Sequence, residues 1–350
     1  MARKKKKKRS PLGVILVLIV SIASAFLGYN YFGKIFSVAT SIEHKEQYFY
    51  VHSDWDRADL VTALSKQKVL QDTASFIWVA DQKQFITTKP GRYLIKDNMS
   101  NNSLINLLRS GKQEPVKVIF NSIRTYEDLA GNVGKQIEAD STELLKAFND
   151  PYQAEKYGFN SVTFFTLFIP NTYELYWNTS AGEFIERMAY EYKRFWSAEK
   201  IAKAKKLNLS QSEASILASI VQAEQMGHPE ERPKVAGLYI NRLRKGMRLQ
   251  SDPTLIFALG DFSIKRVLNE HKLLDSRFNT YTYAGLPPGP INLPEVSSIN
   301  AVLNYQDHNY IYMCAKADFS GYHNFSKTLN QHNVYANEYR RELNRRRIMR

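Results

Sequence analysis

Cysteine is almost absent from this chain of 350 residues, in which Cys314 is the single example. An intramolecular disulfide and a metal site built from several cysteines are therefore excluded. The seven histidines include no H-E-x-x-H pattern and no other compact set of ligands. We expect single polar or packing roles for His228, His323 and His332, and no metal site.

A general basic surface is also absent, although the net charge is +14. Seven positive charges lie in Arg3 to Arg9 and a net five in residues 340–350, which leaves about +2 for everything between. Nucleic-acid-binding proteins carry their positive charge as a patch or stripe on the folded body. The distribution found here argues against nucleic acid as a partner.

Internal repeats and low-complexity linkers are missing as well, which excludes solenoids and long flexible tethers. The chain is 44% hydrophobic and 13% aromatic, enough for one large or two moderate cores. We expect two folded domains behind a short N-terminal segment.

One long apolar run follows the basic N-terminus. Residues 12–32 contain no charge and, at about 1.5 Å per residue, are long enough to cross a bilayer as a helix. Ala23-Ser24-Ala25 resembles a signal-peptide cleavage site. The apolar character nevertheless continues to Phe32, and Tyr29 and Tyr31 suit an interfacial aromatic belt, so a retained anchor is favoured. The positive-inside rule then places residues 34–350 outside the cytoplasm.

Short strands and capped helices alternate over the next hundred residues. Strands are predicted at 48–51, 91–95 and 116–120. A capping-box spacing from Ser53 to Asp56 predicts a helix that carries Leu60 and Leu64. Ser100 predicts the start of a second helix, which Gly111 ends. Together these segments predict a small α+β module of the kind that binds glycans, although packing alone would also explain the pattern.

The chain from about residue 126 is longer and mostly helical. Thr125-x-x-Asp128 predicts a helix start, and the dense apolar run from Phe164 to Pro170 predicts a core strand. The expected fold class is therefore α+β, with a single N-terminal transmembrane helix, a small α+β module and a larger, mostly helical α+β domain.

The most informative helix is opened by the capping box Ser210-x-x-Glu213 and should end near Gly227. At about 100° per residue, Glu224 lies on the same side of this helix as Leu217 and Val221. Burial disfavours the charged form of a carboxyl group and so raises its pKa, which is what a general acid requires. The alternative is that Glu224 turns to solvent or pairs with an arginine such as Arg242.

Several ordered motifs around this helix resemble one known family. They are residues 218–256, Asn279-Thr280-Tyr281 and 285–291, and the similarity extends to 91–112, 170–173 and 321–325. In this combination and order they resemble the endolytic murein transglycosylase (YceG-like) family, over most of the chain. The family's catalytic glutamate falls on Glu224. Many members have a second glutamate two residues earlier, where this chain has Gln222.

The resemblance implies a bacterial inner-membrane enzyme with a LysM-like module before its catalytic domain. The expected organisation is a cytoplasmic tail at 1–11, a transmembrane helix at 12–32, the LysM-like module at 33–120 and the catalytic domain at 121–350. The catalytic part would be periplasmic. The expected partners are peptidoglycan strands, the membrane and, by family analogy, the peptidoglycan synthases of the wall-synthesis machinery.

Further candidate substrate-binding residues lie in the motifs that carry the resemblance. Asn241 and Arg242 are on a predicted helix at 234–244, where Arg242 could hold a substrate carboxylate or brace a loop. Asn279 and Tyr281 offer an amide and a stacking ring to sugars. The candidates in turns and stiff loops are Gln250, Asp252, Thr254 and Pro288, although an aspartate before proline is also an ordinary turn residue.

The implied reaction cleaves the MurNAc–GlcNAc bond within nascent strands, leaves 1,6-anhydroMurNAc ends and terminates strand elongation. One carboxyl group suffices, because the 6-hydroxyl of the muramic sugar attacks its own anomeric carbon. No metal or organic cofactor is expected. Three alternatives stay open: a muramidase hydrolase using Glu224 and Asp252, a non-catalytic peptidoglycan-binding scaffold, and a metal-dependent wall amidase.

Overall fold

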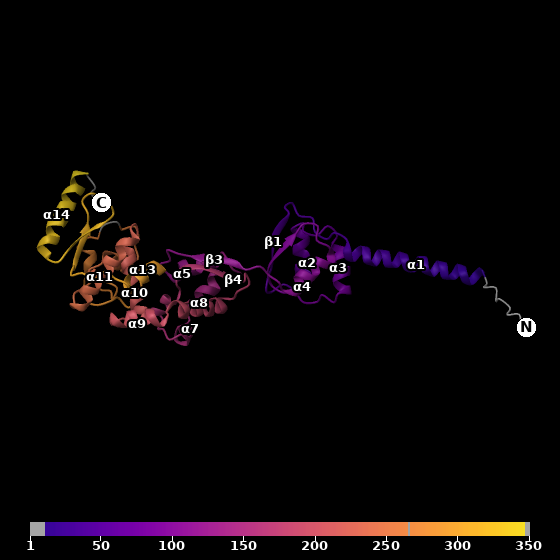
Figure 1. Ribbon diagram of the computed structural model, residues 1–350, viewed down its shortest axis with the longest axis horizontal. Helices are drawn as coiled ribbons and strands as arrows, with labels where there is room; N and C mark the ends of the chain where they lie inside the picture. Colours follow the sequence, from indigo (N-terminus) through magenta and orange to yellow (C-terminus); the bar gives the residue numbers. More distant parts are fainter. Residues whose placement is uncertain (1–10, 265–266, 347–350) are drawn as a thin grey trace, which may run out of the picture. The chain divides into compact units, whose positions relative to one another are not determined.

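The computed structural model describes residues 11–264 and 267–346, and its fold class is α+β and mostly helical, as predicted (Figure 1). Apart from Pro11, the predicted tail at 1–11 lies outside the described residues. The chain forms two compact units. The first comprises Met1–Val116 with Leu175–Asn178, and the second comprises Lys117–Glu174 with Thr179–Arg350.

The first unit begins with the apolar helix α1 (Pro11–Phe36), which continues four residues beyond the predicted Phe32. Over Leu12–Phe36 it is long and apolar enough to cross a membrane, a property that signal sequences share. Its C-terminal end is fixed to the unit by Asn101. The buried Asn101 side chain donates from Nδ2 to the carbonyl oxygen of Lys34 at 3.0 Å and to the hydroxyls of Ser37 and Ser75, each at 3.1 Å.

The rest of the first unit is a two-stranded antiparallel sheet and three short helices. Their bounds are β1 (Glu46–Val51), α2 (Arg57–Lys66), α3 (Thr73–Gln82), β2 (Gly91–Lys96) and α4 (Asn101–Ser110). Glu46 pairs with Lys96, and Val51 with Gly91. Phe49, Phe76 and Tyr93 are fully buried between the sheet and the helices and form the centre of this core.

Two details of this unit differ from the sequence prediction. The capping box before α2 is formed by Asp56 and Asp59 rather than by Ser53 and Asp56, because Asp56 accepts the Asp59 amide at 2.9 Å. Helix α3 was not predicted, since its aromatic and β-branched residues give no clear helical stripe. The start of α4 at Ser100 and its left-handed end at Gly111 are confirmed.

The first part of the second unit is built around the pair β3 (Val116–Phe120) and β4 (Asn171–Leu175). Between these two strands in the chain lie α5 (Tyr126–Val133), α6 (Ser141–Phe148) and α7 (Pro151–Lys156), and α8 (Ala181–Phe195) follows β4. The prediction of a core strand from Phe164 to Pro170 is wrong. Thr163–Leu167 forms a buried 3-10 helix that contacts α8 and α10, and an unbroken apolar run does not distinguish these two structures.

The second part of this unit surrounds α10 (Gln211–Glu224), which contacts α11 (Arg232–Arg244), α12 (Asp252–Leu259) and α13 (Val296–Leu303). The other elements are α9 (Ala198–Lys206), two 3-10 turns at Pro229–Glu231 and His271–Leu273, β5 (Tyr312–Ala315), β6 (His323–Ser326) and α14 (Leu329–Arg345). The capping box of α10 is confirmed, but the helix ends at Glu224 instead of near Gly227. Ala214 to Gln222 is buried throughout, so α10 has no single apolar stripe.

Candidate active site

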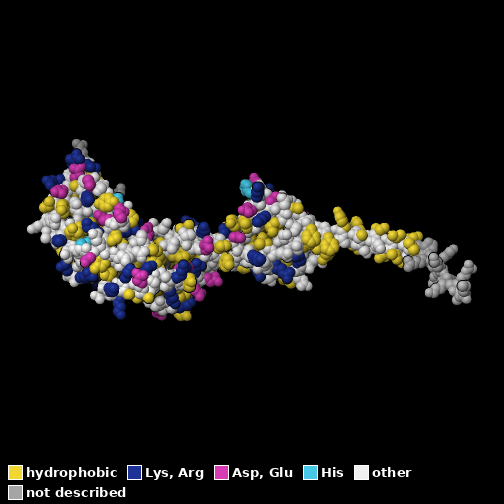
Figure 2. All heavy atoms as spheres, in the orientation of Figure 1, with side chains coloured by type: hydrophobic (Ala, Val, Ile, Leu, Met, Phe, Trp, Pro, Cys, Tyr) yellow, Lys and Arg dark blue, Asp and Glu magenta, His cyan; other side chains and the backbone are white. Residues whose placement is uncertain are grey.

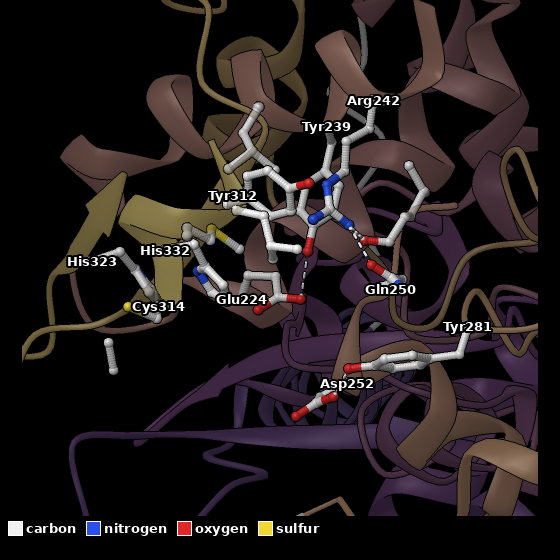
Figure 3. Close-up of a pocket in the computed structure, with 15 residues that line it drawn as sticks. Glu224, Tyr239, Arg242, Gln250, Asp252, Tyr281, Tyr312, Cys314, His323 and His332 are labelled. Atoms are coloured by element: carbon white, nitrogen blue, oxygen red, sulfur yellow. Dashed lines mark hydrogen bonds between the residues drawn. The ribbon is translucent and has the colours of Figure 1, made fainter. Parts of the chain in front are cut away.

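Glu224 is the last residue of α10 and lies on a cavity of about 430 Å³ (Figure 3). Helix α11 and the turn that precedes α12 form one side of this cavity, whereas β5, β6 and the start of α14 form another. Residues from 224 to 332 therefore contribute to a single hollow. The alternative in which Glu224 turns to solvent is not observed, because its side chain is partly buried and lines this cavity.

Two hydroxyl groups donate hydrogen bonds to the same oxygen of Glu224. Ser251 Oγ lies 2.5 Å from Oε1, and the phenolic oxygen of Tyr239 lies 2.7 Å from it. Ser251 occupies the N-cap position of α12, yet its hydroxyl makes no capping bond and serves Glu224 instead. Among the described residues, no donor reaches the second oxygen, Oε2.

The surroundings of Glu224 favour the protonated carboxyl group. Burial raises its pKa, and the negative charge of Asp252 acts in the same direction. The hydrogen bonds from Ser251 and Tyr239 and the nearby His323 oppose this rise without cancelling it. Because both hydroxyls donate to Oε1, the proton of the neutral acid belongs on Oε2.

Asp252, Tyr281 and Gln250 line the same cavity, so the structure brings these three predicted site residues together with Glu224. Asp252 is exposed at the start of α12 and accepts a hydrogen bond from the hydroxyl of Tyr281. Burial and the adjacent Asp252 carboxylate raise the pKa of Tyr281, which therefore remains a hydroxyl donor. Gln250 adopts a left-handed backbone conformation with φ of 52°.

Arg242 also lines the cavity, but it forms no ion pair with Glu224. Its guanidinium is buried and donates from Nε to the Ile311 carbonyl at 2.7 Å and from Nη1 to the Leu249 carbonyl at 2.7 Å. Two roles were predicted for Arg242, holding a substrate carboxylate or bracing a loop. The contacts with these carbonyl oxygens correspond to the second role. The suggested pairing of Glu224 with this arginine is not observed.

Four predicted substrate-binding residues do not line this cavity. Asn241 donates to the carbonyl oxygens of His308 at 2.6 Å and Tyr310 at 3.1 Å. Thr254 is buried and donates to the Ser251 carbonyl at 2.7 Å, which holds the turn that carries Ser251. Both side chains therefore support backbone near the cavity, and direct substrate binding by them stays a prediction.

Asn279 and Pro288 are the other two predicted substrate-binding residues that do not line the cavity. Asn279 is fully buried, and its Nδ2 donates to the carbonyl oxygens of Lys272 at 3.1 Å and Leu274 at 2.7 Å. Pro288 lies on a separate hollow of about 670 Å³ beside the start of α10. Sugar binding by Asn279 and Pro288 also stays a prediction.

Gln222 and Glu224 have different surroundings although they are two residues apart. Oε1 of the buried Gln222 accepts the Glu295 amide at 2.7 Å and the Ser298 hydroxyl at 2.9 Å. Gln222 thus fixes the start of α13 and does not line the cavity that holds Glu224.

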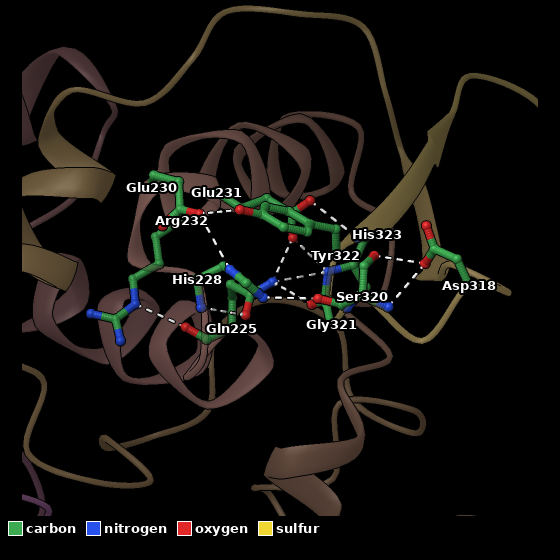
Figure 4. A network of polar contacts seen from close by, with 10 residues as sticks. All are labelled: Gln225, His228, Glu230, Glu231, Arg232, Asp318, Ser320, Gly321, Tyr322 and His323. Atoms are coloured by element: carbon green, nitrogen blue, oxygen red, sulfur yellow. Dashed lines mark hydrogen bonds and ion pairs between the residues drawn. The ribbon is translucent and has the colours of Figure 1, made fainter.

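A second polar network, which the sequence did not predict, holds the hairpin of β5 and β6 against the segment after Glu224 (Figure 4). Nδ1 of His323 lies 2.7 Å from Oε2 of Glu231, and the same oxygen accepts Gln225 Nε2 at 2.6 Å. Burial acts against these bonds, but the net result is a lowered pKa for Glu231. Next to them, His228 stacks on Tyr322 with ring centres 3.9 Å apart.

Comparison with known proteins identifies the family. The model of the YceG-like family matches residues 49–338. The endolytic murein transglycosylase of Bacillus subtilis (strain 168) is 35% identical over 162 residues, which are 46% of this chain and 44% of that protein. The protein of the same name from Streptococcus pneumoniae serotype 2 (strain D39 / NCTC 7466) is 26% identical over 288 residues, 73% of this chain and 52% of that protein. The chain thus spans about half the length of the curated relatives it matches.

A solved structure agrees at the level of the fold. The crystal structure of a yceG-like protein from Listeria monocytogenes aligns with a TM-score of 0.56 and 24% identity. The alignment covers 83% of this chain and 98% of that chain. Because the family model extends over most of the sequence, the chain belongs to the YceG-like family.

Proposed function

We propose that this chain is an endolytic peptidoglycan transglycosylase with Glu224 as its catalytic acid. The observation that carries the proposal is the carboxyl group of Glu224, whose Oε1 accepts two hydroxyl donors while Oε2 has none among the described residues. The raised pKa keeps a proton available on this group. The names of the two relatives, both endolytic murein transglycosylases, support the same chemistry.

In the proposed reaction, Oε2 of Glu224 donates its proton to the glycosidic oxygen between MurNAc and GlcNAc. The bond from that oxygen to C1 of the muramic sugar breaks, and the 6-hydroxyl oxygen of the same sugar forms a new bond to C1. The Glu224 carboxylate then accepts the proton of that hydroxyl and is restored as the acid. The products are a 1,6-anhydroMurNAc end and a free 4-hydroxyl on GlcNAc, and no water is consumed.

A two-carboxylate hydrolase is the second candidate function, because Asp252 lines the same cavity as Glu224. In that mechanism Asp252 would act as nucleophile or would activate a water molecule, and the product would be a reducing end. The hydrogen bond from Tyr281 to Asp252 suits an orienting role equally well. The identity of the strand ends distinguishes the two reactions.

The deciding experiment digests purified peptidoglycan with the wild type, Glu224→Gln and Asp252→Asn, and analyses the products by mass. The wild type should give internally cut strands with anhydro ends, which are lighter by one water than reducing ends. Glu224→Gln should fold normally and lose activity by roughly 10² to 10⁴, the usual contribution of general acid catalysis. Asp252→Asn should lose less. Reducing ends would establish the hydrolase, and an active, folded Glu224→Gln would exclude Glu224 from the mechanism.

The finer organisation is part of the same proposal. We infer that α1 is a retained anchor in the bacterial inner membrane, with the catalytic unit in the periplasm. We also infer that residues 33–120 act as a LysM-like module that binds glycan. An enzyme held there would meet nascent strands beside the peptidoglycan synthases and would terminate their elongation. A non-catalytic, membrane-anchored scaffold is the alternative, and it predicts that Glu224→Gln changes nothing.

A further inference from the structure

Arg242 is a buried cation without an acidic partner. The residue is 7% exposed, and no ion pair links it to any carboxylate in the described part of the chain. The guanidinium donates only to carbonyl oxygens and to Oε1 of Gln250, at 3.3 Å, and Nη2 has no acceptor among the described residues. A buried cation whose acceptors are all neutral still lacks an opposite charge, which makes a ligand anion the natural complement.

His332, on α14, is the second unsatisfied group of this cavity. Its Nδ1 is buried and has no hydrogen-bond partner within residues 11–264 and 267–346. Burial lowers the pKa of the imidazole, and the positive charges of Arg242 and Arg340 lower it further, so the ring is neutral. A neutral imidazole can donate one N–H bond to a ligand, and an unpaired buried polar atom calls for such an explanation.

Arg242 and His332 both lie close to the ring of Tyr312. The His332 ring stacks on it with centres 5.4 Å apart and planes inclined by 27°, and the Arg242 guanidinium carbon lies 5.4 Å from the same ring centre. Figure 3 shows Arg242, Tyr312 and His332 around the hollow that also holds Glu224. Asp252 lines this hollow too, but it accepts a hydrogen bond from Tyr281 and forms no ion pair with Arg242.

We propose that Arg242 and His332 form a subsite for a carboxylate carried by the muramic sugar, an inference that rests on the proposed function. A guanidinium edge and an N–H donor suit the planar oxygens of a carboxylate. In peptidoglycan only every second sugar, MurNAc, carries the lactyl ether and the peptide stem attached to it. A carboxylate subsite therefore distinguishes MurNAc from GlcNAc and selects which of the two alternating glycosidic bonds is placed at Glu224.

The carboxylate has two possible sources, and a binding experiment distinguishes them. The full-length Glu224→Gln chain is used so that no ligand is cleaved. The three ligands are a stem-less peptidoglycan tetrasaccharide with free lactyl carboxylates, the same tetrasaccharide with its peptide stems, and neutral chitotetraose. At least one acidic ligand should bind roughly tenfold or more tightly than chitotetraose, as expected for one charge-assisted contact. Preference for the stem-less ligand identifies the lactyl group, and preference for the other identifies the stem.

Variants of His332 then locate the subsite. His332→Ala, in the same chain, should remove most of the preference for the acidic ligand and leave chitotetraose binding unchanged. His332→Gln keeps an N–H donor and should retain part of the preference. Asn333→Ala is the matched control, because Asn333 is the exposed neighbour of His332 on α14 and does not line the cavity.

Two results would overturn the subsite. One is equal binding of all three ligands by the unmodified Glu224→Gln chain, and the other is an equal loss for all three ligands in a folded His332→Ala variant. With an otherwise wild-type chain, His332→Ala should raise KM for acidic strands while kcat changes little. Since the ligand comparison requires no turnover, it can fail while the anhydro products of the wild type still support the proposed function, and the reverse is equally possible.

Discussion

The hydroxyl of Tyr239 lies 2.7 Å from Oε1 of Glu224, although the two residues belong to different helices. Tyr239 and Ser251 are neutral donors, and no cation pairs with Glu224 in the described part of the chain. A cation would lower the pKa of the acid much more strongly than a hydroxyl does. The carboxyl group is thus held in place while it can still give up and regain a proton.

Removal of the Tyr239 hydroxyl should change the pH dependence of turnover. Activity requires protonated Glu224, so kcat/KM should fall as pH rises through the pKa of that group. The bond from Tyr239 lowers this pKa, and Tyr239→Phe should therefore move the alkaline limb to higher pH while the plateau rate falls. Ser251→Ala should act in the same direction. Tyr283→Phe, which alters a tyrosine bonded to Asp275 outside the cavity, should leave the limb unmoved.

The stability of the folded protein should depend on pH because of Glu224. Because burial raises its folded pKa above the ordinary value of 4.5, the folded state holds this proton more tightly than the unfolded state. Its contribution is complete below that ordinary value and is lost as pH rises through the folded pKa. Thermal unfolding should show Glu224→Gln to be more stable than the wild type at alkaline pH, with the gap closing toward pH 4. A gap that widened on acidification would contradict this account.

Gln222 should matter for folding and not for chemistry. Gln222→Ala removes the acceptor of the Glu295 amide and the Ser298 hydroxyl and leaves both unpaired. The loss should cost about 1–3 kcal/mol in the free energy of unfolding, measured by denaturant titration. Turnover of the folded variant should stay close to that of the wild type. A loss as large as that of Glu224→Gln would give Gln222 a part in the reaction.

The proposed anchor predicts a topology. A reporter that is active only outside the cytoplasm should work when fused after residue 350, because the basic block before the apolar helix should remain inside. The full-length chain should stay with membranes after a high-salt wash. A mature protein that begins near Phe26 would show instead that the helix is a cleaved signal peptide.

The proposed glycan-binding module can be tested by deletion. Since β3 pairs with β4 of the second unit, the deletion should cover residues 44–114 and leave β3 in place. Binding to isolated peptidoglycan should weaken or the cleavage positions should change, while some anhydro product is still formed. If the shortened protein is folded and fully active on polymer, the module has another role.

The sequence predicted correctly those helix starts and strands that depend on residues close together in the chain. The capping box of Ser210 and Glu213, the helix start at Ser100 and the alternating burial of β3 all depend on residues a few positions apart. Ser251, Tyr239 and His332 were not identified as site residues, because their positions beside Glu224 depend on tertiary packing. Of the three, Ser251 could most easily have been identified from the sequence, since it lies inside the Gln250–Thr254 motif. A serine at that position, however, is also typical of an ordinary helix cap.

The wall formed by β5, β6 and α14 is synthesised after the helix that carries Glu224, so the two sides of the cavity are made in a fixed order. Glu224 is synthesised about a hundred residues before His332, and the hairpin of β5 and β6 that completes the cavity is synthesised after α10, α11, α12 and α13. A chain that emerges N-terminus first therefore has its acid long before it has a place to hold a sugar. Under the proposed function, a chain that has been synthesised only as far as α13 cannot cut the cell wall, and its cleaving activity begins only after β5, β6 and α14 have been added.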